Sequence, residues 1–216
     1  MAPDFRLIAE QYLSPTPAGA YYAVSDPVDE PTRRMLFGLL HEASTRIATP
    51  PAIAGWIGVA SEAEAIEVLY RAQQVGWVQG EDRPRRMRGA TLEGDAPALL
   101  GELSSEGCAL LSDVQGFYIS RSGFAHEAAE ELALLAAELM QSVDRRAGLL
   151  QKNLGIAGGA WAAVDAAGNS QFGIWPLHMG SSRLCLTVLG TPRFNRPAFT
   201  ELVWMIVSRY GAGAKA

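Results

Sequence analysis

The three histidines and the Ser112-Asp113 pair are the side chains considered first as candidates for catalysis. His41, His126 and His178 lie far apart, and none has a second ligand at the spacing of a metal site. Ser112 and Asp113 are adjacent, but no Gly-x-Ser-x-Gly elbow surrounds the serine, and an acid suits the turn that follows. The sequence therefore predicts a protein that is not an enzyme and that needs no cofactor and no metal.

Glycine patterns give little support to nucleotide binding. The chain contains no GxxxxGK[ST] loop, which is the sequence that cradles phosphates in P-loop proteins. Residues 155–160 (GIAGGA) are rich in glycine, but they open an expected strand, whereas a pyrophosphate site needs a helix N-terminus. We interpret this segment as a loop.

A basic loop over residues 80–91 is the strongest charge cluster. It carries four arginines: Arg83, Arg85, Arg86 and Arg88. They are candidates for phosphate contact by the wing of a DNA-binding domain, or for a solvated loop that neutralises nearby acids. The helix expected over 61–75 would have to enter the DNA groove, yet it presents three glutamates and one arginine. Each close like-charge pair costs about 1 kcal/mol in water. DNA is therefore not the expected partner.

Composition places the chain among ordinary globular proteins. Its 216 residues are 49% apolar and 19% charged, with a net charge of -5, so there is no overall basic field for nucleic acid or an anionic membrane. No apolar stretch reaches the roughly 18 residues of a membrane span. Cys108 and Cys185 lie in apolar runs without a CxxC pair, and the first residues lack a signal-peptide pattern. We expect a cytoplasmic protein, and its bias of 16 arginines to 2 lysines is compatible with a bacterial source.

The first half of the chain has the element order of a winged helix-turn-helix. Residues 1–19 form an N-terminal segment with a helix over 5–13, and a short strand is expected over 21–24. Helices over 32–47, 52–56 and 61–75 follow, then a strand at 77–79 and the basic loop. Spacing over residues 20–91 resembles the winged-helix family, so we predict a winged-helix-like domain there. This half carries a net charge of -6 through residue 106, against +1 for the rest, which also indicates two units.

The second half, residues 92–210, predicts a sheet with helices on its faces. A helix over 92–106 precedes a hairpin of strands 108–113 and 117–120. A long helix over 125–147, three strands at 160–164, 171–177 and 183–189, and a last helix over 198–210 follow. The predicted class is α+β, with a five-stranded antiparallel sheet and a tail at 211–216.

This order resembles the Roadblock/dynein light-chain family. The most family-like points are the Asp113-x-x-Gly116-Phe117 hairpin and the helical sequence AEELALLAAELMQSV that follows it. The resemblance implies a non-enzymatic homodimer that regulates or scaffolds a small Ras-like GTPase. It also implies a dimer interface built from the long helix and the strand after it. The candidate interface residues are Leu132, Leu135, Leu139, Val143, Trp161 and Ala163.

Two other functions stay open from the sequence. The first is a DNA-binding transcription regulator, in which the winged helix contacts DNA through Arg85 and Arg86 and the second half dimerises. The second is a small-ligand sensor with a pocket beneath the long helix.

Overall fold

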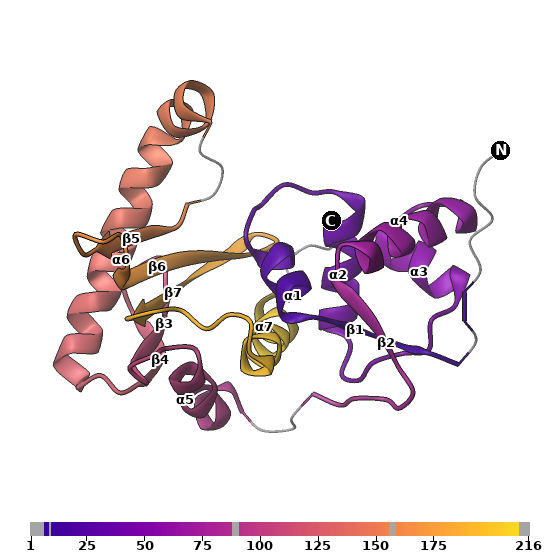
Figure 1. Cartoon of the computed structure of the whole chain (residues 1–216), viewed down its shortest axis with the longest axis horizontal. Helices are drawn as coiled ribbons and strands as arrows, with labels where there is room; N and C mark the ends of the chain where they lie inside the picture. The colour runs from indigo at the N-terminus through magenta and orange to yellow at the C-terminus, as the bar shows by residue number, and fades with distance from the viewer. Residues whose placement is uncertain (1–6, 9, 88–90, 156–158, 212–216) are drawn as a thin grey trace.

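The computed structural model describes residues 7–8, 10–87, 91–155 and 159–211 of the chain. A five-stranded antiparallel sheet lies in the second half, and a two-stranded sheet lies among the helices of the first half (Figure 1). The predicted α+β class and the five-stranded sheet are confirmed. Within the described residues, none of the helices combines the length and the apolar character needed to cross a membrane.

In its described residues, the first half consists of four helices and two strands. In chain order they are β1 (Tyr12–Pro15), α1 (Pro17–Val24), α2 (Pro31–His41), α3 (Pro50–Ile57), α4 (Glu62–Gln74) and β2 (Val78–Glu81). Side-chain caps explain where the helices begin, because the residue before each helix accepts a hydrogen bond from a free backbone N–H of the first turn. Three of these helices also start at a proline, which suits the first helical position.

Two expected elements of this half were wrong. The helix over 5–13 is not formed in its described part, since Tyr12 and Leu13 belong to β1, which pairs antiparallel with β2. The strand over 21–24 is instead the end of α1. Thr16 starts that helix, because its hydroxyl accepts a hydrogen bond from the Gly19 N–H at 3.1 Å and Pro17 follows as the first helical residue. The pattern Tyr-Tyr-Ala-Val is compatible with either structure, and the cap decides.

The winged-helix prediction is not confirmed. The expected helices follow one another, but β2 pairs with β1 from the N-terminal segment and not with the basic loop. The basic loop instead contacts the stretch after α2, where Ser44 and Arg86 form an antiparallel bridge. The predicted helix over 32–47 ends at His41 for the same reason, because extended backbone is needed from Glu42 onward.

The second half contains the elements that the sequence predicted, together with the short element η1 (Leu149–Asn153), which it did not predict. The predicted ones are α5 (Leu92–Glu102), β3 (Ala109–Asp113), β4 (Tyr118–Ser122), α6 (His126–Gly148), β5 (Trp161–Val164), β6 (Ser170–Met179), β7 (Ser182–Leu189) and α7 (Pro197–Tyr210). The element η1 is a single π-helical turn that continues α6. The sheet order is β4-β3-β7-β6-β5, so β4 and β5 are the two edge strands.

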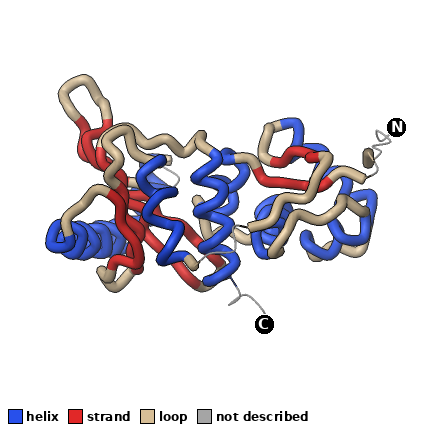
Figure 2. Tube along the Cα trace, turned by 90° about the horizontal axis from the view of Figure 1, so that it is seen from below, coloured by secondary structure: helices blue, strands red, loops and turns tan. Residues whose placement is uncertain are grey.

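The sheet separates one helix from the others (Figure 2). On one face, Leu110, Ile174 and Cys185 pack beneath α6. On the other face, Leu111, Leu177 and Leu186 join a core with residues of α5 and α7. In Figure 2 the strands lie between α6, seen nearly end-on at the left, and the helices in the middle of the view.

One continuous core joins the two halves. The same hydrophobic cluster holds Leu36 and Leu40 from α2, Ile53 from α3 and Phe199 from α7. The Ser208 hydroxyl of α7 donates a hydrogen bond to the Leu40 carbonyl oxygen at 3.2 Å. The predicted units 20–91 and 92–210 are therefore packed against each other through α7.

Candidate protein interface

The long helix α6 is held closely on the sheet by small residues. Its buried side consists mainly of alanines, with Met140 and Val143 near its C-terminal end. Because these side chains are small, the helix axis can lie close to the strands. Arg183 of β7 adds a forked ion pair, since its two terminal nitrogens lie 2.9 and 2.7 Å from the Asp144 carboxylate oxygens. The arginine lowers the pKa of the Asp144 carboxyl.

The hairpin before α6 fixes where the helix starts its path across the sheet. One Asp113 carboxylate oxygen accepts hydrogen bonds from the Gln115 and Phe117 N–H groups at 2.8 and 3.0 Å. Gly116 has a φ of 92°, and a Cβ there would lie 2.7 Å from a Leu134 methyl carbon. Glycine is thus required both by the backbone and by the close approach of the helix. Asp113 is therefore a turn residue, as the sequence indicates.

Strand β5 is a bare sheet edge. All four of its side chains are exposed, and its ladder partner is β6. Trp161 stands opposite Ile174 and Ala163 opposite Phe172. Paired residues of an antiparallel ladder point to the same face, so both side chains share the face covered by α6.

Large apolar side chains are exposed on α6, just after it and on this edge. They are Leu134, Leu135, Leu149, Leu154, Trp161 and Val164, which together we call the α6–β5 surface; of these, Leu134 lies on the side of the β3–β4 hairpin, beside Gly116. Trp161 is 46% exposed and Leu135 is 40% exposed. Exposed apolar groups beside an unpaired strand edge usually mark a place where another chain binds.

The predicted interface residues divide into three groups. Leu135, Trp161 and Ala163 are exposed, while Leu132 and Leu139 are half-buried and pack against the core clusters beneath α6. Val143 is only 8% exposed and belongs to the cluster with Met140 and Ile174, so it faces its own sheet. The prediction omitted four members of the surface: Leu134, Leu149, Leu154 and Val164. Leu134 was visible in the sequence as a widening of the apolar stripe.

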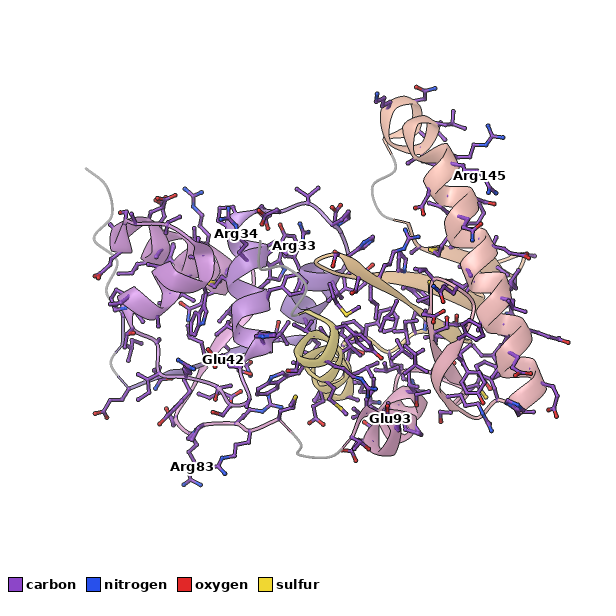
Figure 3. All side chains as sticks on the ribbon, turned by 180° about the vertical axis from the view of Figure 1, so that it is seen from behind. Arg33, Arg34, Glu42, Arg83, Glu93 and Arg145 are labelled. Atoms are coloured by element: carbon purple, nitrogen blue, oxygen red, sulfur yellow. The ribbon has the colours of Figure 1, made fainter. Side chains whose placement is uncertain are left out.

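The basic loop does not present four available arginines. Arg83 and Arg86 are exposed, and Figure 3 shows Arg83 pointing outward from the loop. Arg85 is turned toward the core, where its guanidinium lies 3.5 Å from Glu81 and 3.8 Å from Glu201. Arg88 lies outside the described residues. The three glutamates of α4 are exposed as expected, and their negative charges would repel a polyanion such as DNA.

The remaining polar candidates occupy different parts of the described structure. Tyr118 Oη and His126 Nδ1 share a hydrogen bond at 2.8 Å, and Ser112 is buried in β3. Among the residues that the structure describes, no three His, Cys, Asp or Glu side chains are close enough to hold a metal ion. His41 and His178, distant in the sequence, line the same cleft between the halves. That proximity was not predicted.

The strand order, the hairpin and the long helix define an α+β protein whose second half is built around a five-stranded antiparallel sheet. Among solved structures, the chain is similar to a Roadblock/LC7 domain from Streptomyces avermitilis, at 21% identity and a TM-score of 0.36, over 50% of this chain and 88% of that one. It is also similar to MglB of Myxococcus xanthus, at 16% identity and a TM-score of 0.36, over 56% of this chain and 90% of that one. The sequence matches no family model and no curated protein.

Proposed function

We propose that this chain is a non-enzymatic homodimeric regulator or scaffold that binds a small Ras-like GTPase through its Roadblock-like half. The α6–β5 surface is the observation that carries the proposal. It combines an unpaired strand edge with large exposed apolar side chains, and both features are relieved when a second chain covers them.

A two-fold arrangement suits this surface. In a two-fold dimer each residue meets the same surface on the partner, so a single apolar patch is sufficient. Pairing of β5 with its copy would satisfy the free backbone groups of both edges and bring Trp161 of each chain near α6 of the other. The dimer would then be a continuous sheet with two long helices on one face.

The GTPase would bind on the outer side of those helices. The outward side of α6 exposes four glutamates (Glu127, Glu130, Glu131 and Glu138), followed by Arg145 and Arg146 at its end. This charge order is stable for a helix, because acids lie toward the N-terminus and bases toward the C-terminus. It also offers complementary charge to a partner with a basic patch, which favours encounter more than affinity.

Dimerisation is tested first, by light scattering on the full chain. Leu135→Arg should give a folded monomer, because the new charge has no counter-ion in an apolar interface. Val75→Arg is the matched control, since Val75 is an exposed apolar residue at the end of α4 in the first half and is not part of the α6–β5 surface. A wild-type chain that stays monomeric at high concentration, or a Leu135→Arg variant that stays dimeric, would contradict the proposed interface.

GTPase binding is tested by affinity capture from the source cells, with lysate supplied with either a non-hydrolysable GTP analogue or GDP. We expect a Ras-like GTPase to be enriched by the wild type and by Val75→Arg but not by the monomeric variant. If the wild type is a dimer and captures no GTPase in either nucleotide state, the partner is wrong while the assembly stands.

A further inference from the structure

A cleft of about 690 Å³ opens between the two halves of the chain, away from α6. The first half contributes Arg34, Phe37 and Trp56 from α2 and α3, and the second half contributes His178 of β6 and Val207 of α7. Its volume lies within the usual range for small-molecule sites. The sequence placed a possible ligand pocket beneath α6, but alanines fill that space.

One wall of the cleft is built around an indole ring. Gly38 of α2 faces Trp56 of α3, and a Cβ at Gly38 would lie 2.6 Å from the Trp56 Cγ atom. The missing side chain therefore lets the indole lie against α2. Phe37, half-buried beside Gly38, lines the same cleft. Two aromatic side chains offer a planar ring more favourable contact than a branched aliphatic group.

Two consecutive arginines of α2 behave differently at this site (Figure 3). Arg33 is only 7% exposed, and two of its nitrogens are engaged: its Nε donates to the Tyr22 carbonyl oxygen at 3.2 Å and its Nη1 to that of Val28 at 2.5 Å. Arg34 is partly exposed, and its Nε lies 3.1 Å from Asp29 Oδ1. Within the part of the chain that the structure describes, no hydrogen bond occupies the two terminal nitrogens of Arg34. That edge of the guanidinium can bind an anion.

We propose that this cleft binds a small aromatic carboxylate. The ring would lie against Phe37 and Trp56, and the carboxylate would accept a forked pair of hydrogen bonds from the Arg34 Nη atoms. His41 and His178 would supply further N–H donors from the opposite sides of the cleft. A single charge is favoured, because among the described lining residues Arg34 is the arginine with both terminal nitrogens free of hydrogen bonds, and Asp26 and Asp29 line the cleft too.

Such a ligand would contact both halves at once, so its binding would stabilise their packing. This consequence is independent of GTPase binding and of dimerisation. Ligand binding at the cleft can therefore be followed both by the melting temperature of the chain and by calorimetry.

The test uses three probes on the full chain: 2-naphthoate, its neutral amide 2-naphthamide, and the non-aromatic acid cyclohexanecarboxylate. We expect 2-naphthoate to bind in calorimetry and to raise the melting temperature. The amide and the non-aromatic acid should each bind about tenfold more weakly or worse, as expected when a charged hydrogen bond or an aromatic contact is lost. Equal binding of the acid and the amide would overturn the role of Arg34, and no binding of 2-naphthoate at millimolar concentration would overturn the site.

Substitutions locate the binding. Arg34→Gln should weaken 2-naphthoate at least tenfold while far-UV circular dichroism stays unchanged. Arg46→Gln is the matched control, because Arg46 of the first half also forms an exposed ion pair, with Glu42, but does not line the cleft. Trp56→Leu should weaken 2-naphthoate and leave cyclohexanecarboxylate unaffected. Equal affinities for wild type, Arg34→Gln and Arg46→Gln would show that the probe binds elsewhere and would refute the proposal.

Discussion

The indole Nε1 of Trp204 donates a hydrogen bond to the Glu42 carbonyl oxygen at 2.7 Å, across 162 positions of sequence. The donor belongs to the last helix and the acceptor follows α2, so the bond joins the two halves where their core is continuous. Trp204 itself is almost fully buried.

Trp204→Phe should therefore lower the free energy of unfolding by about 1 to 2 kcal/mol, because the ring is largely kept while the Glu42 carbonyl loses its partner. Urea unfolding followed by both circular dichroism and tryptophan fluorescence measures the change. Since the core is shared, we expect a single transition with both probes. Two separated transitions would show that the halves unfold independently.

Two glycines inside helices of the first half should respond to alanine with opposite signs. Gly55 of α3 is exposed and has open space around its Cα, so Gly55→Ala should stabilise the chain by about 0.5–1 kcal/mol through helix propensity. Gly38→Ala should destabilise it by about 1–3 kcal/mol, because the new methyl displaces Trp56. Thermal unfolding of both variants decides the sign. Stabilisation by both would mean that Trp56 does not rest on α2.

Stability should fall on acidification through His178. Burial lowers the pKa of its imidazole, and the nearby Arg183 charge acts in the same direction, with Arg33 adding to it and Asp26 and Asp144 opposing. The unfolded chain then takes up a proton near pH 6.5 that the folded chain still refuses. The contribution of neutral His178 is present above pH 6.5 and is lost as the pH falls toward the folded pKa, by up to about 1.4 kcal/mol per pH unit.

Urea titrations at pH 7.5, 6.5 and 5.5 measure this effect against His178→Gln. The wild type should lose stability relative to the variant as the pH falls. Parallel pH profiles for the two proteins would place the acid sensitivity at other groups.

The Arg183–Asp144 fork should contribute little to global stability despite its geometry. Asp144 is half-exposed, so solvent screens the pair, and a double-mutant cycle with Arg183→Gln and Asp144→Asn should give a coupling energy of about 1 kcal/mol or less. Raising the salt concentration should reduce it further. A coupling energy of several kcal/mol would indicate that α6 depends on this pair for its position.

The second half could be predicted well because its signals are local. The apolar runs of β3 and β7, the 3.6-residue period of α6 and the Asp113 turn are each visible within a short stretch of sequence. The first half could not be predicted to the same degree. Residues 21–24 have both strand and helix character, and β1 finds its partner 63 or more positions away, at Val78 and beyond. Pairing at that distance leaves no local pattern.

The cleft shows the same limit more sharply. His41 ends a helix and His178 lies in a strand, and the two line one cleft where α7 packs against both α2 and the sheet. No spacing rule connects residues brought together by a third element. Surface exposure was equally hidden: Val143 and Leu135 lie in one apolar stripe of the sequence, yet Val143 is buried and Leu135 is exposed.

The unpaired edge of β5 also makes assembly compete with aggregation while the protein is being synthesised. Its side chains carry no charge and include no proline, so nothing at this edge repels another extended segment. A newly folded chain must meet its proper partner before it meets a partly folded neighbour. The yield of folded protein should consequently fall at high expression rates. Ala162→Lys should improve the recovery of folded protein, but it should weaken assembly.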